Sequence, residues 1–186
     1  MEAHIYLDLL RSAGVLGASD PGDPDGWTRL TECPIGWTLH ADGADGAFRP
    51  FDIVIPYRDL AEARRTGVRF GSRVSTLIDA WQWREVAQVY AEQAIEAGLT
   101  AAGSPRDQRL LDVALQAWRF AVDMAAEALR FLPAGADRLP RAAFWTRDGL
   151  RAYQSDPDQF SRAELQRQVD IYRQLSDDFA EMMVGK

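Results

Sequence analysis

The chain has 186 residues, of which 47% are hydrophobic and 26% charged, and its net charge is −7. This length and composition are those of an ordinary globular protein with a hydrophobic core. No apolar run approaches the roughly 18 residues that a membrane span requires. The single cysteine excludes an internal disulfide, and the acidic, amphipathic N-terminus does not resemble a secretory signal. We therefore expect a cytoplasmic protein without membrane spans.

Acidic residues are concentrated in the N-terminal third. Residues 1–60 carry ten acidic residues and four arginines, a balance of −6, whereas residues 61–186 carry 18 acidic and 17 basic residues, a balance of −1. An acidic surface repels nucleic acid and attracts basic partners. The charge distribution therefore makes nucleic-acid binding unfavourable and favours a basic protein partner, although surface acidity also serves solubility alone.

The first seventy residues predict a small α+β unit. Residues 2–13 have the apolar spacing of a short helix. Segments rich in aromatic and β-branched residues predict strands at 27–31, 36–41 and 48–55. Asp45-Gly46 is typical of the turn between the last two strands, and residues 57–66 predict a second short helix. We expect a sheet of two or three antiparallel strands in residues 1–70.

Residues 71–186 predict a bundle of three or four helices. Helical patterns cover about 74–97, 105–132, 140–153 and 161–184. Ser104 and Pro105 fit the N-terminal cap and first turn of the second helix, and Ser161 with Glu164 forms a capping box for the last. Gly149 weakens the third helix through its low helix propensity. The fold class is thus α+β, mostly α, and we expect the two parts to pack as one compact domain.

The second bundle helix is expected at the centre, because its apolar arc is wider than one stripe. Glu127 falls in its remaining polar sector, which predicts a solvated position. Met182 and Met183 continue the apolar stripe of the last helix, and methionines in such a stripe are usually core.

Two tryptophans stand two residues apart in the first bundle helix and therefore point to roughly opposite sides. Trp83 shares its side with Val86 and Tyr90, which predicts a position in the bundle core. Trp81 continues an apolar row with Val74, Leu77 and Ile78 on the other side, and this row predicts contact with the N-terminal unit. Beyond Trp81 the same side carries polar residues such as Glu85.

Few motifs point to metal or nucleotide chemistry. Histidine occurs only twice, which excludes histidine-rich zinc sites, and P-loop, G-x-G-x-x-G and G-x-S-x-G motifs are absent. Cys33 and His40 are close enough in sequence to suggest a thiol–imidazole dyad, but a lone cysteine is usually a small buried hydrophobic residue. We expect no metal or cofactor, and the missing catalytic motifs favour a non-enzymatic function.

Two groups of residues are candidate binding residues. A groove at the junction of the two parts, a common location for ligand sites, would be lined by Trp81, Glu85, Glu92, Arg69 and Arg73. In the arginine-rich stretch 63–73, Arg64 and Arg65 are candidates for binding an anion. The alternatives are that Trp81 is interdomain core and that the charged residues are solvated.

The interpretation that these patterns favour is a cytosolic accessory or inhibitor-type protein. It would act by protein–protein contact through its acidic N-terminal surface, on a basic partner. The alternative is a small-molecule binding protein or a small helical-bundle enzyme, whose junction groove would use Glu85, Glu92 or Asp79 in acid–base chemistry, with arginines binding an anion. Homo-oligomer formation stays open.

Overall fold

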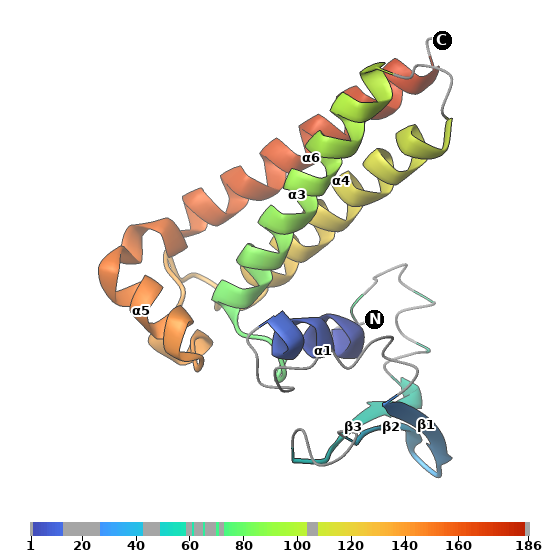
Figure 1. Cartoon of the computed structure of the whole chain (residues 1–186). Coiled ribbons are helices and arrows are strands. Elements are labelled where there is room, and N and C mark those ends of the chain that lie inside the picture. The colour runs from blue at the N-terminus through green and yellow to red at the C-terminus, as the bar shows by residue number, and fades with distance from the viewer. Residues whose placement is uncertain are drawn as a thin grey trace. The chain divides into compact units, whose positions relative to one another are not determined.

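The computed structural model describes residues 2–12, 27–42, 49–58, 61, 65, 70, 73–103 and 108–184. The chain divides into two compact units, Met1–Arg73 and Val74–Lys186. The first contains a short helix and a sheet, and the second is helical (Figure 1). The predicted class, α+β and mostly α, is confirmed.

The first unit is built on a three-stranded antiparallel sheet. Its elements are α1 (Glu2–Ser12), β1 (Thr28–Cys33), β2 (Gly36–Ala41) and β3 (Phe51–Pro56). The strand order β1-β2-β3 makes β2 the central strand. The sheet was predicted to have two or three strands, and it has three. The predicted turn at Asp45-Gly46 and most of the predicted helix 57–66 lie outside the described residues.

The two faces of the sheet differ in polarity because side chains alternate along each strand. Leu39, Ala41 and Ile53 are buried on one face. The ring of Tyr6 on α1 meets that of Phe51 edge-on, with centroids 6.1 Å apart. The opposite face carries mostly polar residues, namely Arg29, Thr31, Cys33, Thr38, His40, Asp52 and Val54.

Tyr57, directly after β3, is held against the turn between β1 and β2. Its amide donates to the carbonyl of Ile35 at 3.0 Å, and its hydroxyl donates to the carboxylate of Glu32. This hydrogen bond is the main reason why the pKa of Tyr57 is raised from 10.0 to about 12.

We expect Glu32→Gln to return the pKa of Tyr57 towards its ordinary value. Because the folded-state pKa lies above the unfolded value, the contact contributes stability below about pH 10 that is lost as the pH rises through about 12. Alkaline titration of tyrosinate absorbance in wild type and Glu32→Gln measures the shift, and Tyr57→Phe identifies which of the five tyrosines it belongs to. An unchanged Tyr57 titration in Glu32→Gln would contradict the assignment.

Three long helices form the second unit. They are α3 (Ala80–Gly103), α4 (Gln108–Leu129) and α6 (Arg162–Val184). The chain between α4 and α6 contains the short helices η3 (Arg141–Ala143), α5 (Arg147–Ser155) and η4 (Pro157–Phe160). α4 packs on both α3 and α6, which confirms its predicted central place. α3 and α6 run in the same direction and α4 runs in the opposite one (Figure 1).

The first bundle helix begins at Ala80, six residues later than predicted. Asp79 and Gln82 form a reciprocal cap in which the amide of each donates to the side-chain oxygen of the other, at 3.0 and 2.9 Å. Before this cap, the hydroxyl of Ser75 accepts from the amides of Leu77 and Ile78 in a turn. The helix also extends to Gly103, beyond its predicted end at 97.

The predicted helix 140–153 is divided into η3 and α5, because Thr146 caps a new helix at Arg147. The predicted start of the last helix is confirmed, since the hydroxyl of Ser161 accepts from the amide of Glu164 at 3.4 Å. Ser104 and Pro105 lie outside the described residues.

Burial confirms one core prediction and corrects two. Trp83 is fully buried, as expected for a core residue. Glu127 was expected in solvent but is 4% exposed, and its carboxylate pairs with the guanidinium of Arg130 at 2.7 Å. Met182 is predicted in the core but is 60% exposed, because it stands six residues beyond the buried Ser176 and therefore about 120° around the helix from it.

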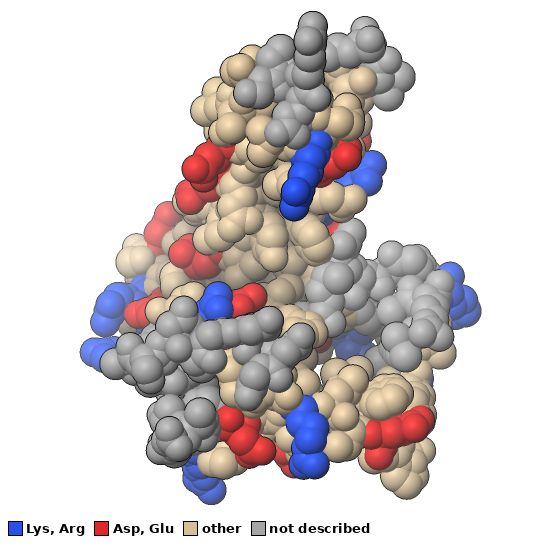
Figure 2. All heavy atoms as spheres, turned by 45° about the vertical axis from the view of Figure 1, so that its right-hand side comes forward, with Lys and Arg blue, Asp and Glu red and all other residues tan. Residues whose placement is uncertain are grey.

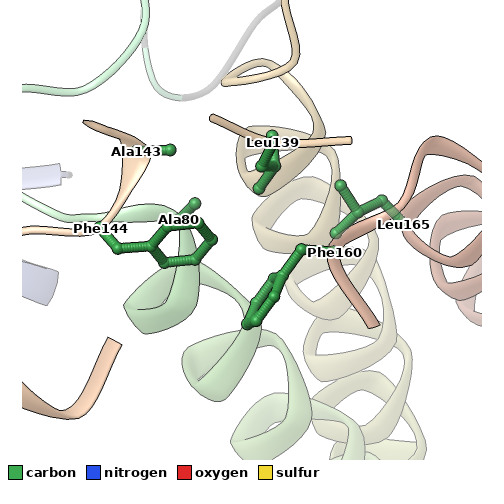
Figure 3. Packing of buried hydrophobic residues seen from close by; sticks show 6 residues of the cluster. All are labelled: Ala80, Leu139, Ala143, Phe144, Phe160 and Leu165. Carbon is green, nitrogen blue, oxygen red and sulfur yellow. The ribbon is translucent and has the colours of Figure 1, made fainter. Parts of the chain in front are cut away.

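An apolar cluster closes one end of the bundle. Its buried members come from the start of α3, the connecting segment, η4 and α6, and they are Ala80, Leu139, Ala143, Phe144, Phe160 and Leu165 (Figure 3). The rings of Phe144 and Phe160 meet edge-on with centroids 4.6 Å apart. Trp81 is partly buried against this cluster, so its burial has a cause within its own unit.

Candidate functional site

The residues predicted to bind a ligand fall in both units. Arg64 and Arg69 lie outside the described residues, whereas Arg65 and Arg73 are exposed residues of the first unit. The other predicted residues, Trp81, Glu85 and Glu92, are on α3 in the second unit. The junction groove stays a prediction, as does the anion site.

Trp81, Glu85 and Glu92 share one side of α3, because they stand four and seven residues apart. Both glutamates are exposed, and partial burial of the Glu85 carboxyl raises its pKa. Two apolar residues continue the same row beyond Glu92. Ile95 is 51% exposed and Leu99 is 71% exposed.

A matching row lies on α6. Leu175 is 40% exposed and Met182 is 60% exposed, seven residues further along the same side. Phe179 lies between them in sequence, and its ring approaches α3 so closely that a Cβ atom at Gly98 would be 3.3 Å from it. The two exposed rows therefore flank the contact between α3 and α6. We call Ile95, Leu99, Leu175 and Met182 together the α3–α6 seam.

Acidic side chains border this seam. Glu92 precedes Ile95 by three residues on α3, and Asp178 stands between Leu175 and Met182 on α6. Both acids are exposed. From Glu85 to the end of α3 there are three acidic residues and no lysine or arginine, and the same is true of α6 from residue 174 to its end. Figure 2 draws one face of the molecule, on which both acidic and basic side chains are visible.

Arg84 fixes the other end of the α3–α6 contact. Its Nε donates to Gln168 Oε1 on α6 at 3.0 Å, its Nη1 donates to the carbonyl of Gln159 at 3.2 Å, and its guanidinium lies 5.1 Å from the centre of the Phe160 ring. Burial lowers the pKa of Arg84. Its hydrogen-bond partners in the described part of the chain are neutral oxygens, so Arg84 acts there as a structural link between α3 and α6.

The proposed dyad of Cys33 and His40 is wrong. Cys33 pairs with Gly36 in the sheet, four residues from His40 along β2, which is a separation of about 13 Å at 3.3 Å per residue. Both ring nitrogens of His40 have other partners, Thr31 and Asp52. These two residues were not recognised from the sequence, because their proximity depends on the register of three strands.

Comparison with known proteins gives no relative: no protein-family model, curated protein or solved structure matches the chain. Within the described residues, no helix is both long enough and apolar enough to cross a membrane. In the same residues, no group of three or more histidine, cysteine, aspartate or glutamate side chains is placed to hold a metal ion.

Proposed function

We propose that this protein is a cytoplasmic accessory protein that binds an amphipathic helix of a basic partner protein along the α3–α6 seam. A basic protein is the class of partner that the acidic composition favours. The binding surface, however, is on the bundle rather than on the acidic N-terminal third.

The observation that carries the proposal is the exposure of four large apolar side chains on two adjacent helices. Single exposed apolar residues are normal, whereas two rows on helices that contact each other offer several apolar side chains to one ligand. Such a surface suits an amphipathic helix, whose apolar side chains recur at three- and four-residue intervals and can lie between two helices. Burying a fully exposed side chain of this size contributes about 1.5–3 kcal/mol, and the half-exposed seam side chains would contribute roughly half of that each.

The charges around the seam favour a basic partner over a second copy of this chain. A second copy would bring Glu92 and Asp178 close to the same acids of its neighbour, and like charges in an interface are unfavourable. A helix with lysine or arginine beside its apolar face would place opposite charges there. These charges would also increase the rate of association at low salt.

The test uses a synthetic 18-residue peptide with leucines at helical spacing and lysines elsewhere, labelled for fluorescence anisotropy. A scrambled peptide of the same composition controls for attraction by charge alone. We expect the helical peptide to bind and the double variant Leu99→Ser/Met182→Ser to bind at least tenfold more weakly, a loss of about 1.4 kcal/mol or more. Val113→Ser is the matched control, because Val113 is 50% exposed on α4, outside the seam.

Equal binding of the scrambled peptide, or equal affinity of the seam variant and Val113→Ser, would overturn the proposal. Sedimentation velocity addresses the second copy: a wild-type dimer that Leu99→Ser/Met182→Ser dissociates would identify the seam as a self-association surface instead. Far-UV circular dichroism verifies that each variant remains folded.

A further inference from the structure

The polar face of the sheet in the first unit joins a hydroxyl, an imidazole and a carboxylate. Thr31 Oγ1 on β1 lies 2.6 Å from His40 Nε2 on β2. His40 Nδ1 lies 2.7 Å from Asp52 Oδ1 on β3. Each strand supplies one member, and the central strand supplies the imidazole that connects the other two.

The register of the sheet explains this geometry. His40 stands directly opposite Asp52 on β3 and Arg29 on β1. Thr31 follows Arg29 by two residues, so it lies on the same face and diagonally across from His40. The histidine ring therefore reaches a directly opposite carboxylate with one nitrogen and a diagonal hydroxyl with the other.

The carboxylate determines where the imidazole carries its proton. Asp52 is acceptor-only when ionised, so the neutral ring places its hydrogen on Nδ1 and donates it to Asp52. Nε2 then presents a lone pair, and the hydroxyl of Thr31 donates to it. The opposite tautomer would direct the Nδ1 lone pair at a negative oxygen. Hydrogen bonding thus prepares the hydroxyl to lose its proton to the ring, which is the arrangement of an activated nucleophile.

The group is accessible and has a cation beside it. The His40 side chain is 24% exposed and that of Asp52 is 59% exposed. Arg29 is exposed on the same face. It takes part in none of the ion pairs found among the described residues. A guanidinium in this position can stabilise negative charge on a substrate oxygen.

We propose that Thr31 is a nucleophile for acyl transfer from activated esters, with His40 as general base, Asp52 as a positioning residue and Arg29 at the carbonyl oxygen. Thr31 Oγ1 attacks the carbonyl carbon while its proton passes to His40 Nε2. The bond from carbon to the leaving oxygen then breaks, and His40 returns the proton to that oxygen. Water attacks the acyl-threonine in the same manner, which releases the carboxylic acid and restores the hydroxyl.

The test uses the full chain with 4-nitrophenyl acetate as the probe. Intact mass spectrometry shortly after mixing should show one added acetyl group, and peptide mapping should place it on Thr31. Thr31→Val keeps the side-chain shape and removes the nucleophile, so it should lose the adduct and lower the rate at least tenfold. Thr38→Val is the matched control, because Thr38 lies opposite Thr31 on the same face, and it should retain both.

Asp52→Asn tests the positioning role. It should lower kcat at least tenfold and leave KM within twofold, because the change affects the imidazole and not the ester. Acetylation confined to residues other than Thr31, or equal turnover by Thr31→Val and Thr38→Val, would overturn the proposal. Circular dichroism of each variant identifies loss of folding, and in that case Thr31→Ser, which keeps a hydroxyl, must retain the adduct.

Discussion

Replacing Asp79 with alanine is expected to lower the free energy of unfolding of the second unit by about 3–5 kcal/mol. Asp79 is fully buried. Its Oδ1 accepts from the amide of Gln82 at 2.9 Å. Its Oδ2 accepts from the amides of Trp145 and Thr146, at 3.2 and 2.9 Å, and from the hydroxyl of Thr146 at 2.6 Å.

This carboxylate connects two helix starts that are far apart in sequence. Asp79 caps α3, and Thr146, which it holds, caps α5 through a 3.1 Å hydrogen bond from the amide of Gly149. Alanine would leave four donors without the acceptor that they share, in partly buried surroundings, and a donor that water cannot reach has the full cost of its desolvation. The effect should therefore exceed the loss of a single helix cap, which is about 1 kcal/mol.

Urea denaturation followed by circular dichroism and tryptophan fluorescence measures the change. Asp79→Asn keeps the shape and one acceptor oxygen, so it should cost less than alanine, about 2 kcal/mol. Asp170→Ala is the matched control, because Asp170 is exposed and pairs with Arg173 at 3.2 Å only one helical turn away. We expect it to change stability by about 0.5 kcal/mol or less. Equal effects of Asp79→Ala and Asp170→Ala would contradict the role of the buried carboxylate.

Periodicity predicted the parts of this fold that depend on burial along one element. Trp83 was assigned to the core because its neighbours at helical spacing are apolar, and it is fully buried. The same rule placed the start of the first bundle helix too early. Leu77 and Ile78 keep helical spacing with Trp81, yet their amides bond to Ser75 in a turn. Apolar spacing indicates which side chains are buried, but not which backbone groups are paired.

Periodicity along one element does not predict interactions between different elements or between side chains. The polar sector of the second bundle helix predicted a solvated Glu127, but a carboxylate can be buried when it is paired, and Glu127 pairs with Arg130. Thr31, His40 and Asp52 meet only because three strands pair in one register. The sequence indicates part of the α3 side of the seam, because Glu92, a predicted binding residue, lies on the same side of the helix as Leu99. The opposing row on α6 was not selected, because exposed apolar residues there resemble core positions.

Replacing Gly149 with alanine is expected to destabilise the second unit by about 2–3 kcal/mol, although alanine is the better helix former. In an exposed helix interior the same change stabilises by about 1 kcal/mol. Gly149 is buried, and a Cβ atom there would lie 2.7 Å from Asp79 Oδ2 and 2.8 Å from Thr146 Oγ1. The glycine that appeared to weaken the helix thus leaves room for the hydrogen bonds that begin it.

Gly103→Ala separates this steric effect from helix propensity. Gly103 is the last residue of α3, and a Cβ atom there meets no neighbour within 4 Å. We expect Gly103→Ala to leave the free energy of unfolding unchanged or to raise it by up to about 1 kcal/mol. If urea denaturation shows that Gly149→Ala lowers the free energy of unfolding and Gly103→Ala does not, the result would support steric crowding at Gly149. A stabilising Gly149→Ala would show that Asp79 and Thr146 can move apart at low cost, and the large effect expected for Asp79→Ala would then lose its physical basis as well.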